Sequence, residues 1–176
     1  NQLQDLSPLS KLTRLYGIWI PANNTKDISV LKRLENLHIL ILEKNPVEDI
    51  EVLSDLHRLV QLNLAATAVK DFTPLSALQE LGVLVLKANA IRDISFLSEL
   101  STLEWLDLRN NQVKDLDPVQ KLSRLRKLFL SHNPFTSITP LAQLPALQWL
   151  DLRHTPITSL WPLYHTPQLT DLGLEE

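Results

Sequence analysis

The stretch LEWLDLRNN, residues 103–111, decides the fold of this 176-residue chain. It has the form L-x-x-L-x-L-x-x-N, in which three leucines recur at fixed spacing and Asn111 closes the phrase. The phrase returns every 22 residues in both directions, and 176/22 gives eight units in a single array over residues 1–176. Its other copies are LYGIWIPAN (15–23), LHILILEKN (37–45), LVQLNLAAT (59–67), LGVLVLKAN (81–89), LRKLFLSHN (125–133), LQWLDLRHT (147–155) and the shortened LTDLGLEE (169–176).

In leucine-rich repeats a phrase of this kind carries a strand in its L-x-L part and closes on Asn or Cys. Because the register holds along the whole chain, the sequence resembles the 22-residue, internalin-like class of leucine-rich repeat proteins. The resemblance implies an α/β fold, a right-handed solenoid with a parallel concave β-sheet and 3₁₀ or short helical turns on the convex side. This architecture serves many functions, so the repeat alone does not name an activity.

Composition excludes several functional classes. A net charge of −3 and a pI near 6.0 argue against nucleic-acid binding, which needs a basic face. No apolar run approaches the roughly 18 residues of a membrane span. The absence of Cys rules out disulfides and thiolate chemistry, and three Gly residues form no phosphate-binding loop. We therefore expect a non-enzymatic protein with no catalytic residue, no cofactor and no metal site.

The two ends of the array lack the polar capping units that solenoids need to shield their terminal apolar faces. The first residues already lie inside a repeat, and the last strand is followed by only two residues. We therefore expect a segment of a longer protein, or an array whose ends are covered by flanking domains or a partner.

The Asn or Thr that closes each phrase is expected to be structural. The chain turns off the strand there, which leaves backbone groups without sheet partners, and a buried amide can both donate to and accept from them. The predicted ladder consists of Asn23, Asn45, Thr67, Asn89, Asn111, Asn133 and Thr155.

An acidic column precedes each convex segment, with Ser in its last two units. Asp and Ser accept hydrogen bonds from the N–H groups that begin a helical turn, and the Pro that follows in several units suits a first-turn position. A Ca²⁺ ladder is the alternative, but backbone capping explains both the Ser replacements and the Pro. The column is Asp5, Asp27, Asp49, Asp71, Asp93, Asp115, Ser137 and Ser159.

The outward-facing positions of the strands carry the functional prediction. Alternation along a strand sends side chains such as Trp105, Asp107 and Arg109 onto the concave face, where aromatic and Arg residues are typical of interface hot spots. Lys127 between two indoles suits a cation–π contact. The alternative is that these residues only favour β structure, or pack on flanking domains. The predicted partner-binding residues are Trp19, Ile39, Ile41, Trp105, Arg109, Lys127, Phe129, Trp149 and Arg153.

Two other constellations receive structural interpretations. His132 and His154 are 22 residues apart, so they should stack near Asp151. Such a group could hold a metal, but we interpret both histidines as rim residues of a binding surface. Asp107 and Asp151 lie two strands apart, roughly 9–10 Å, a separation that nominally suits an inverting glycosidase. The Arg residues beside them favour ordinary surface ion pairs.

The sequence therefore predicts a recognition module that binds a protein or peptide on its concave face, in one of three settings. It could be the sensor arm of a larger bacterial intracellular immune or signalling protein, a secreted internalin-like adhesin, or a structural spacer packed on flanking domains. The uneven surface, with Trp, His and Arg in place of Thr- and Asn-rich repetition, favours the sensor and with it a cytoplasmic location.

Overall fold

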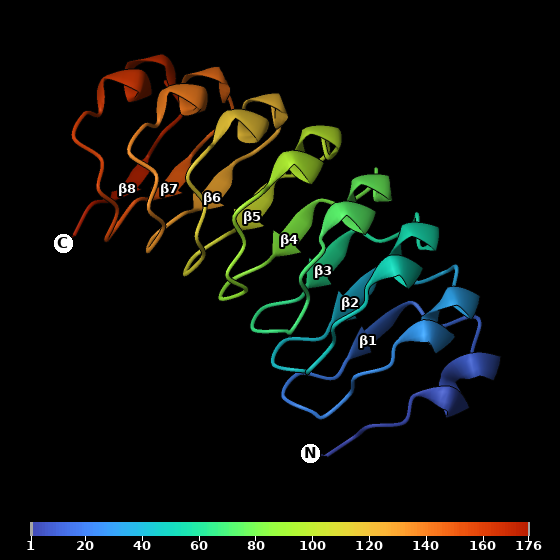
Figure 1. Cartoon of the computed structure of the whole chain (residues 1–176). Coiled ribbons are helices and arrows are strands. Elements are labelled where there is room, and N and C mark those ends of the chain that lie inside the picture. The colour runs from blue at the N-terminus through green and yellow to red at the C-terminus, as the bar shows by residue number, and fades with distance from the viewer. Residues whose placement is uncertain (1, 176) are drawn as a thin grey trace.

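The computed structural model describes residues 2–175 as one curved array (Figure 1). Along this part of the chain, eight three-residue strands alternate with eight five-residue 3₁₀ helices, and no helix is long and apolar enough to cross a bilayer. In chain order the elements are η1 (Ser7–Lys11), β1 (Gly17–Trp19), η2 (Ser29–Arg33), β2 (Ile39–Ile41), η3 (Glu51–Asp55), β3 (Gln61–Asn63), η4 (Thr73–Ala77), β4 (Val83–Val85), η5 (Ser95–Glu99), β5 (Trp105–Asp107), η6 (Asp117–Lys121), β6 (Lys127–Phe129), η7 (Thr139–Gln143), β7 (Trp149–Asp151), η8 (Trp161–His165) and β8 (Asp171–Gly173).

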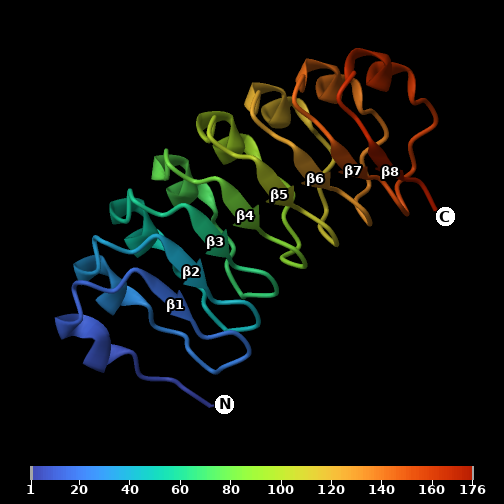
Figure 2. The same ribbon diagram turned by 180° about the vertical axis from the view of Figure 1, so that it is seen from behind.

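All strands pair in parallel and in sequence order, β1 through β8, so each strand neighbours the units before and after it. The register follows the 22-residue spacing, with Trp105 opposite Lys127 and Asp107 opposite Phe129. The 3₁₀ helices follow the outer curve of the array, and Figures 1 and 2 show this from opposite sides. This is the predicted leucine-rich-repeat solenoid, and we call the sheet surface away from the core its open face.

The core is a stack of the predicted Leu, Ile and Val positions. The strand leucines Leu106 and Leu128, and the turn residues Leu97 and Val119, have no exposed surface. Each fully buried side chain of this size stabilises the fold by roughly 1.5–3 kcal/mol, although the ordering of the chain cancels most of that gain. Contacts between elements join neighbouring units only, so stability depends on stacking.

The Asp column caps the 3₁₀ helices. The Oδ1 atom of Asp93 accepts the N–H of Ser95 at 2.8 Å, and Asp71 accepts that of Thr73 at 2.9 Å. The capping residue lies two positions before the first helical N–H, one residue earlier than a standard N-cap. These hydrogen bonds lower the pKa of Asp71, as the equivalent bonds from Ser7 and Ser29 lower those of Asp5 and Asp27. The bonds favour capping over a Ca²⁺ ladder.

The Asn column joins adjacent units at the end of each strand. Asn111 accepts the N–H of Ile91 at 2.9 Å through Oδ1, and its Nδ2 atom donates to the carbonyls of Leu86 and Leu108 at 3.0 and 2.8 Å. Thr67 keeps only part of this pattern, donating its hydroxyl to a carbonyl of its own unit. The amide side chains therefore satisfy backbone groups that have left the sheet ladder.

Candidate binding surface on the open face of the sheet

Three aromatic rings form a continuous cluster over the neighbouring strands β5, β6 and β7. The ring of Phe129 lies 5.5 Å from that of Trp105 and 6.3 Å from that of Trp149, with tilted planes. Phe129 is half-buried between them, whereas Trp105 and Trp149 are 37% and 42% exposed. We call these three residues the aromatic patch. The three residues are diagonal neighbours in the register, because Trp105 and Trp149 lie opposite Lys127 whereas Phe129 lies opposite Asp107 and Asp151. Their rings are large enough to meet across this offset.

Two cations lie against the aromatic patch. The Nζ atom of Lys127 is 4.6 Å from the centre of the Trp105 ring, and the guanidinium carbon of Arg109 is 5.1 Å from that of Phe129. Both distances suit a cation–π interaction. The contact expected between Lys127 and an indole is present, and the contact from Arg109 was not anticipated.

Two equivalent ion pairs flank Phe129. Arg109 binds Asp107 on β5 and Arg153 binds Asp151 on β7, with the Nε atom of each Arg 2.9 and 2.8 Å from a carboxylate oxygen. The sequence interpretation of ordinary surface pairs is wrong in one respect, because the two Asp side chains are only 5% and 3% exposed. Each Arg follows the end of the strand, and its side chain folds back over the Asp two positions earlier and covers its carboxylate.

The hydrogen bonds within these two ion pairs shift the pKa values of their side chains. Hydrogen bonds to Asp107 raise the pKa of Arg109, and those to Asp151 raise the pKa of Arg153. Burial acts to raise the pKa of Asp151, but the hydrogen bonds from Arg153 outweigh it and lower that pKa. A glycosidase acid needs a raised carboxyl pKa, so the state of Asp151 is opposite to that requirement.

The remaining predicted residues form a second, separate group on β1 and β2. Trp19 is 59% exposed, and Ile39 and Ile41 are half-buried. The Trp19 indole lies against Gly17, where a Cβ atom would come within 2.5 Å of its Cζ3 atom. We call Trp19, Ile39 and Ile41 the aliphatic patch. The polar residues of β3 separate it from the aromatic patch, so the nine predicted residues make two surfaces.

His132 and His154 stack at the rim of the sheet, with ring centres 4.3 Å apart. Both residues and the neighbouring Asn110 have positive φ angles of 53–57°. Each backbone N–H donates to a carbonyl of the next unit, which turns the chain sharply off the strand. Within residues 2–175 no cluster of three or more His, Asp or Glu has a geometry suited to a metal ion. The interpretation of both histidines as rim residues of a binding surface stays a prediction.

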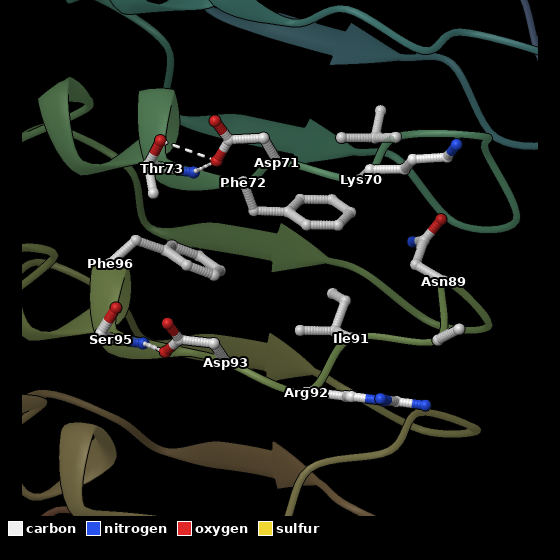
Figure 3. Close-up of a pocket in the computed structure, with 12 residues that line it drawn as sticks. Lys70, Asp71, Phe72, Thr73, Asn89, Ile91, Arg92, Asp93, Ser95 and Phe96 are labelled. Atoms are coloured by element: carbon white, nitrogen blue, oxygen red, sulfur yellow. Dashed lines mark hydrogen bonds between the residues drawn. The ribbon is translucent and has the colours of Figure 1, made fainter.

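A hollow of about 620 Å³ lies on the flank of the array between neighbouring units (Figure 3). The rings of Phe72 and Phe96 stack in it at 6.1 Å. Its carboxylates, Asp71 and Asp93, already bind the amides of their own turns, and Lys70 extends away from the rings (Figure 3). The polar groups of this hollow thus serve the turns, and the open face remains the better candidate.

Two features of the surface were missed by sequence reasoning. The pentapeptide WLDLR occurs at 105–109 and again at 149–153, and an Asp and an Arg two positions apart on one strand face could have indicated the buried pairs. Gly17 lies two positions before Trp19 in a column of larger residues, and this could have indicated that the Trp19 indole packs over it.

Comparisons with known proteins agree with this architecture. A family model described as leucine-rich repeats (two copies) matches residues 101–143. The structure is similar to internalin C2 of Listeria monocytogenes, with a TM-score of 0.96, 33% identity, and coverage of 99% of this chain and 77% of that one. A second Listeria monocytogenes internalin, InlF, is similar with a TM-score of 0.82 and 32% identity, and the match covers 99% of this chain and 58% of InlF. A Leptospira interrogans leucine-rich repeat protein has a TM-score of 0.93 and 26% identity, and the match covers 99% of this chain and 46% of that protein. The chain therefore spans about three quarters, three fifths and less than half of these relatives. No curated protein matches the sequence.

The fold and the matching repeats define a leucine-rich repeat protein, a class that generally works by binding other proteins and is generally non-catalytic. Within that class, the chain belongs to the internalin-like leucine-rich repeat proteins.

Proposed function

We propose that this chain is a non-enzymatic recognition module whose open face binds a protein or peptide partner, with the aromatic patch as the main contact. The observation that carries the proposal is the exposure of Trp105 and Trp149 around Phe129 on an otherwise regular sheet. Contiguous exposed apolar surface on a protein usually marks an interaction site, and Trp is the residue most enriched among interface hot spots.

The support beneath the patch favours binding as well. Its side chains stand on three hydrogen-bonded parallel strands whose inward leucines have no exposed surface. Phe129 packs against both indoles, and Lys127 and Arg109 cover ring faces. Such a preorganised surface loses little conformational entropy when a partner binds, which leaves more of the contact energy as affinity.

The aliphatic patch is proposed as a secondary contact for the same partner. Trp19, Ile39 and Ile41 lie on the same sheet face as the aromatic patch, so a partner that crosses the open face would meet both. The intervening strands carry Gln61 and Val83 at the same outward position, which such a partner would also cover.

A capture experiment with matched aromatic variants tests the proposal. The chain is immobilised, and bound protein is compared between the wild type and a variant carrying Trp105→Ala and Trp149→Ala. The control carries Trp161→Ala and Tyr164→Ala, because these two side chains are 74% and 76% exposed but belong to η8 on the outer curve. We expect the first variant to lose a specific partner and the control to keep it, with unchanged circular dichroism in both. Retained capture by the first variant would refute the proposal.

The larger setting is part of the proposal. The uneven open face, in which Trp, Lys, Phe and Arg gather over only three strands, supports a sensor arm of a bacterial intracellular immune or signalling protein. The 33% identity with internalin C2 supports the second candidate, a secreted internalin-like adhesin. Fractionation of the source cells, followed by detection of the native protein in cytosol or culture medium, separates the two. A protein found only in the medium would overturn the sensor arm.

A further inference from the structure

The aromatic patch lies between two copies of one side-chain arrangement. The sequence WLDLR begins on β5 and again on β7 and ends two residues after each strand. It places a Trp, an Asp and an Arg in the same relative positions on either side of β6. Equivalent residues two strands apart are separated by roughly 10 Å. A partner segment that covers Phe129 therefore meets Arg109 on one side and Arg153 on the other.

These two ion pairs present mainly their cationic side to the surroundings. The side chains of Arg109 and Arg153 are 31% and 43% exposed, whereas their Asp partners are almost completely buried. Each guanidinium uses Nε and Nη2 to bind its Asp. The Nη1 atoms donate no hydrogen bond to another residue in the range 2–175, so each partly exposed guanidinium keeps a charged donor for a partner.

The other charges near the aromatic patch differ between its two sides. Carboxylates lie on the β8 side, where Asp171 is opposite Trp149 and the charge of Glu175 helps to raise the pKa of Arg153, and lysines lie on the β4–β6 side. Lys127 on β6 and Lys87 after β4 make no ion pair with the residues that the structure describes. The exposed carboxylate of Glu104, at the start of these strands, is held 3.7 Å from Arg126. A chain with a net charge of −3 thus presents unpaired lysines on the β4–β6 side of the aromatic patch.

We propose that the partner bound at the aromatic patch is an acidic protein segment. It presents carboxylates about 10 Å apart on either side of an aromatic or long aliphatic side chain. The apolar side chain packs on Phe129 between the two indoles. The carboxylates accept charge-assisted hydrogen bonds from Nη1 of Arg109 and Arg153, with Lys127 and Lys87 adding longer-range attraction. This inference rests on the proposed function and adds the chemistry of the partner.

Three pools of synthetic ten-residue peptides test it. Every peptide has a central Phe, Tyr or Leu with Ala spacers, and the pools differ only in the flanking residues, which are Asp or Glu, Asn or Gln, or Lys. Binding is followed by the tryptophan fluorescence of the intact chain at low and high salt. We expect the acidic pool to bind about tenfold more tightly than the amide pool, the effect of one or two charge-assisted hydrogen bonds, and the basic pool to bind most weakly.

Charge variants test whether the lysines beside the aromatic patch contribute to the preference for acidic peptides. Lys127→Gln together with Lys87→Gln should weaken binding of the acidic pool about threefold at low salt and leave the amide pool unchanged. Lys114→Gln, an exposed position on the flank of the array, is the matched control and should change neither. These substitutions leave the buried ion pairs intact, so loss of folding does not obscure the result.

Several outcomes would overturn the inference. Equal or tighter binding of the amide or basic pool would show that the patch does not prefer acidic peptides. Failure of all three pools to bind would also contradict the inference. If binding of the favoured pool survives Trp105→Ala with Trp149→Ala, the aromatic patch is the wrong site and the proposed function fails with it. Concentration-dependent dimerisation that these Trp changes abolish would assign the face to a second copy of the chain instead.

Discussion

Replacement of Asn111 by Ala is the sharpest test of the stacking account. Asn111 is 7% exposed, and its Oδ1 atom accepts the N–H groups of Asn89 and Ile91 at 3.1 and 2.9 Å. Its Nδ2 atom donates to the carbonyls of Leu86 and Leu108. A longer bond of 3.3 Å joins Nδ2 to the carbonyl of Arg109. Alanine removes all five interactions in a central unit, where water has little access.

The structure shows which of these losses matters. The carbonyl of Leu86 still accepts from Asn89, and that of Leu108 still accepts from Asn133, so both keep a donor. The N–H groups of Asn89 and Ile91 make no other hydrogen bond with residues 2–175. A buried polar group left without a partner costs about 1–3 kcal/mol. Two such groups give an expected loss of about 4 kcal/mol in the free energy of unfolding.

Urea denaturation followed by circular dichroism and tryptophan fluorescence measures this loss. The matched variant is Asn111→Thr, which reproduces the residue found in this column at Thr67, where the hydroxyl donates to the carbonyl of Leu64 at 3.1 Å. It should retain one donor bond, so we expect it to be about 1 kcal/mol less destabilised than the Ala variant. A loss of less than about 1 kcal/mol for Asn111→Ala would show that the ladder does not hold adjacent units together.

Three further predictions concern stability. Leu106→Ala should lower the free energy of unfolding by about 2–5 kcal/mol, because Leu106 is fully buried on a central strand; an unchanged urea midpoint would contradict the register. Thr67→Asn should raise the free energy of unfolding by about 1 kcal/mol, because an amide oxygen there could accept the N–H of Val47 as Asn111 accepts that of Ile91. A lower melting temperature for this variant would count against the prediction. Hydrogen bonds from the turns lower the pKa values of Asp5, Asp27 and Asp71. Their folded pKa values lie below the unfolded ones, so their contribution is present above pH about 4 and is lost as the pH falls through the folded values. Stability measured in urea should therefore change little between pH 7 and 5 through these groups and fall in more acidic solution; a midpoint that rises on acidification would oppose this sign.

The fold could be predicted from spacing alone because each unit repeats the same constraints. A leucine at 106 or 128 points inward in any strand of that register. The capping Asp and the Pro that follows it in several units indicated a short helical turn between strands. The left-handed turn was not anticipated, because six of the seven residues that occupy it after the strands, such as Ala88 and His132, are not the Gly or Asn usually associated with positive φ.

The candidate surface was predictable in outline but not in detail. Alternation identified Trp105, Phe129 and Trp149 as outward residues, and their neighbouring positions follow from the register. The burial of Asp107 and Asp151 depends on how the long Arg side chains fold back, which strand periodicity does not specify. That burial leaves the guanidinium groups of Arg109 and Arg153 as the more exposed partners of both pairs.

The central claim, that the aromatic patch contacts a partner, is tested most directly by site-specific photo-cross-linking. A photoreactive phenylalanine analogue replaces Phe129 in one variant and the outer-curve residue Tyr164 in another, each in the full native protein made by its own cells. Our account predicts one discrete cross-linked adduct from position 129 and none of the same mass from position 164. No adduct at 129, or the same adduct from both positions, would contradict it.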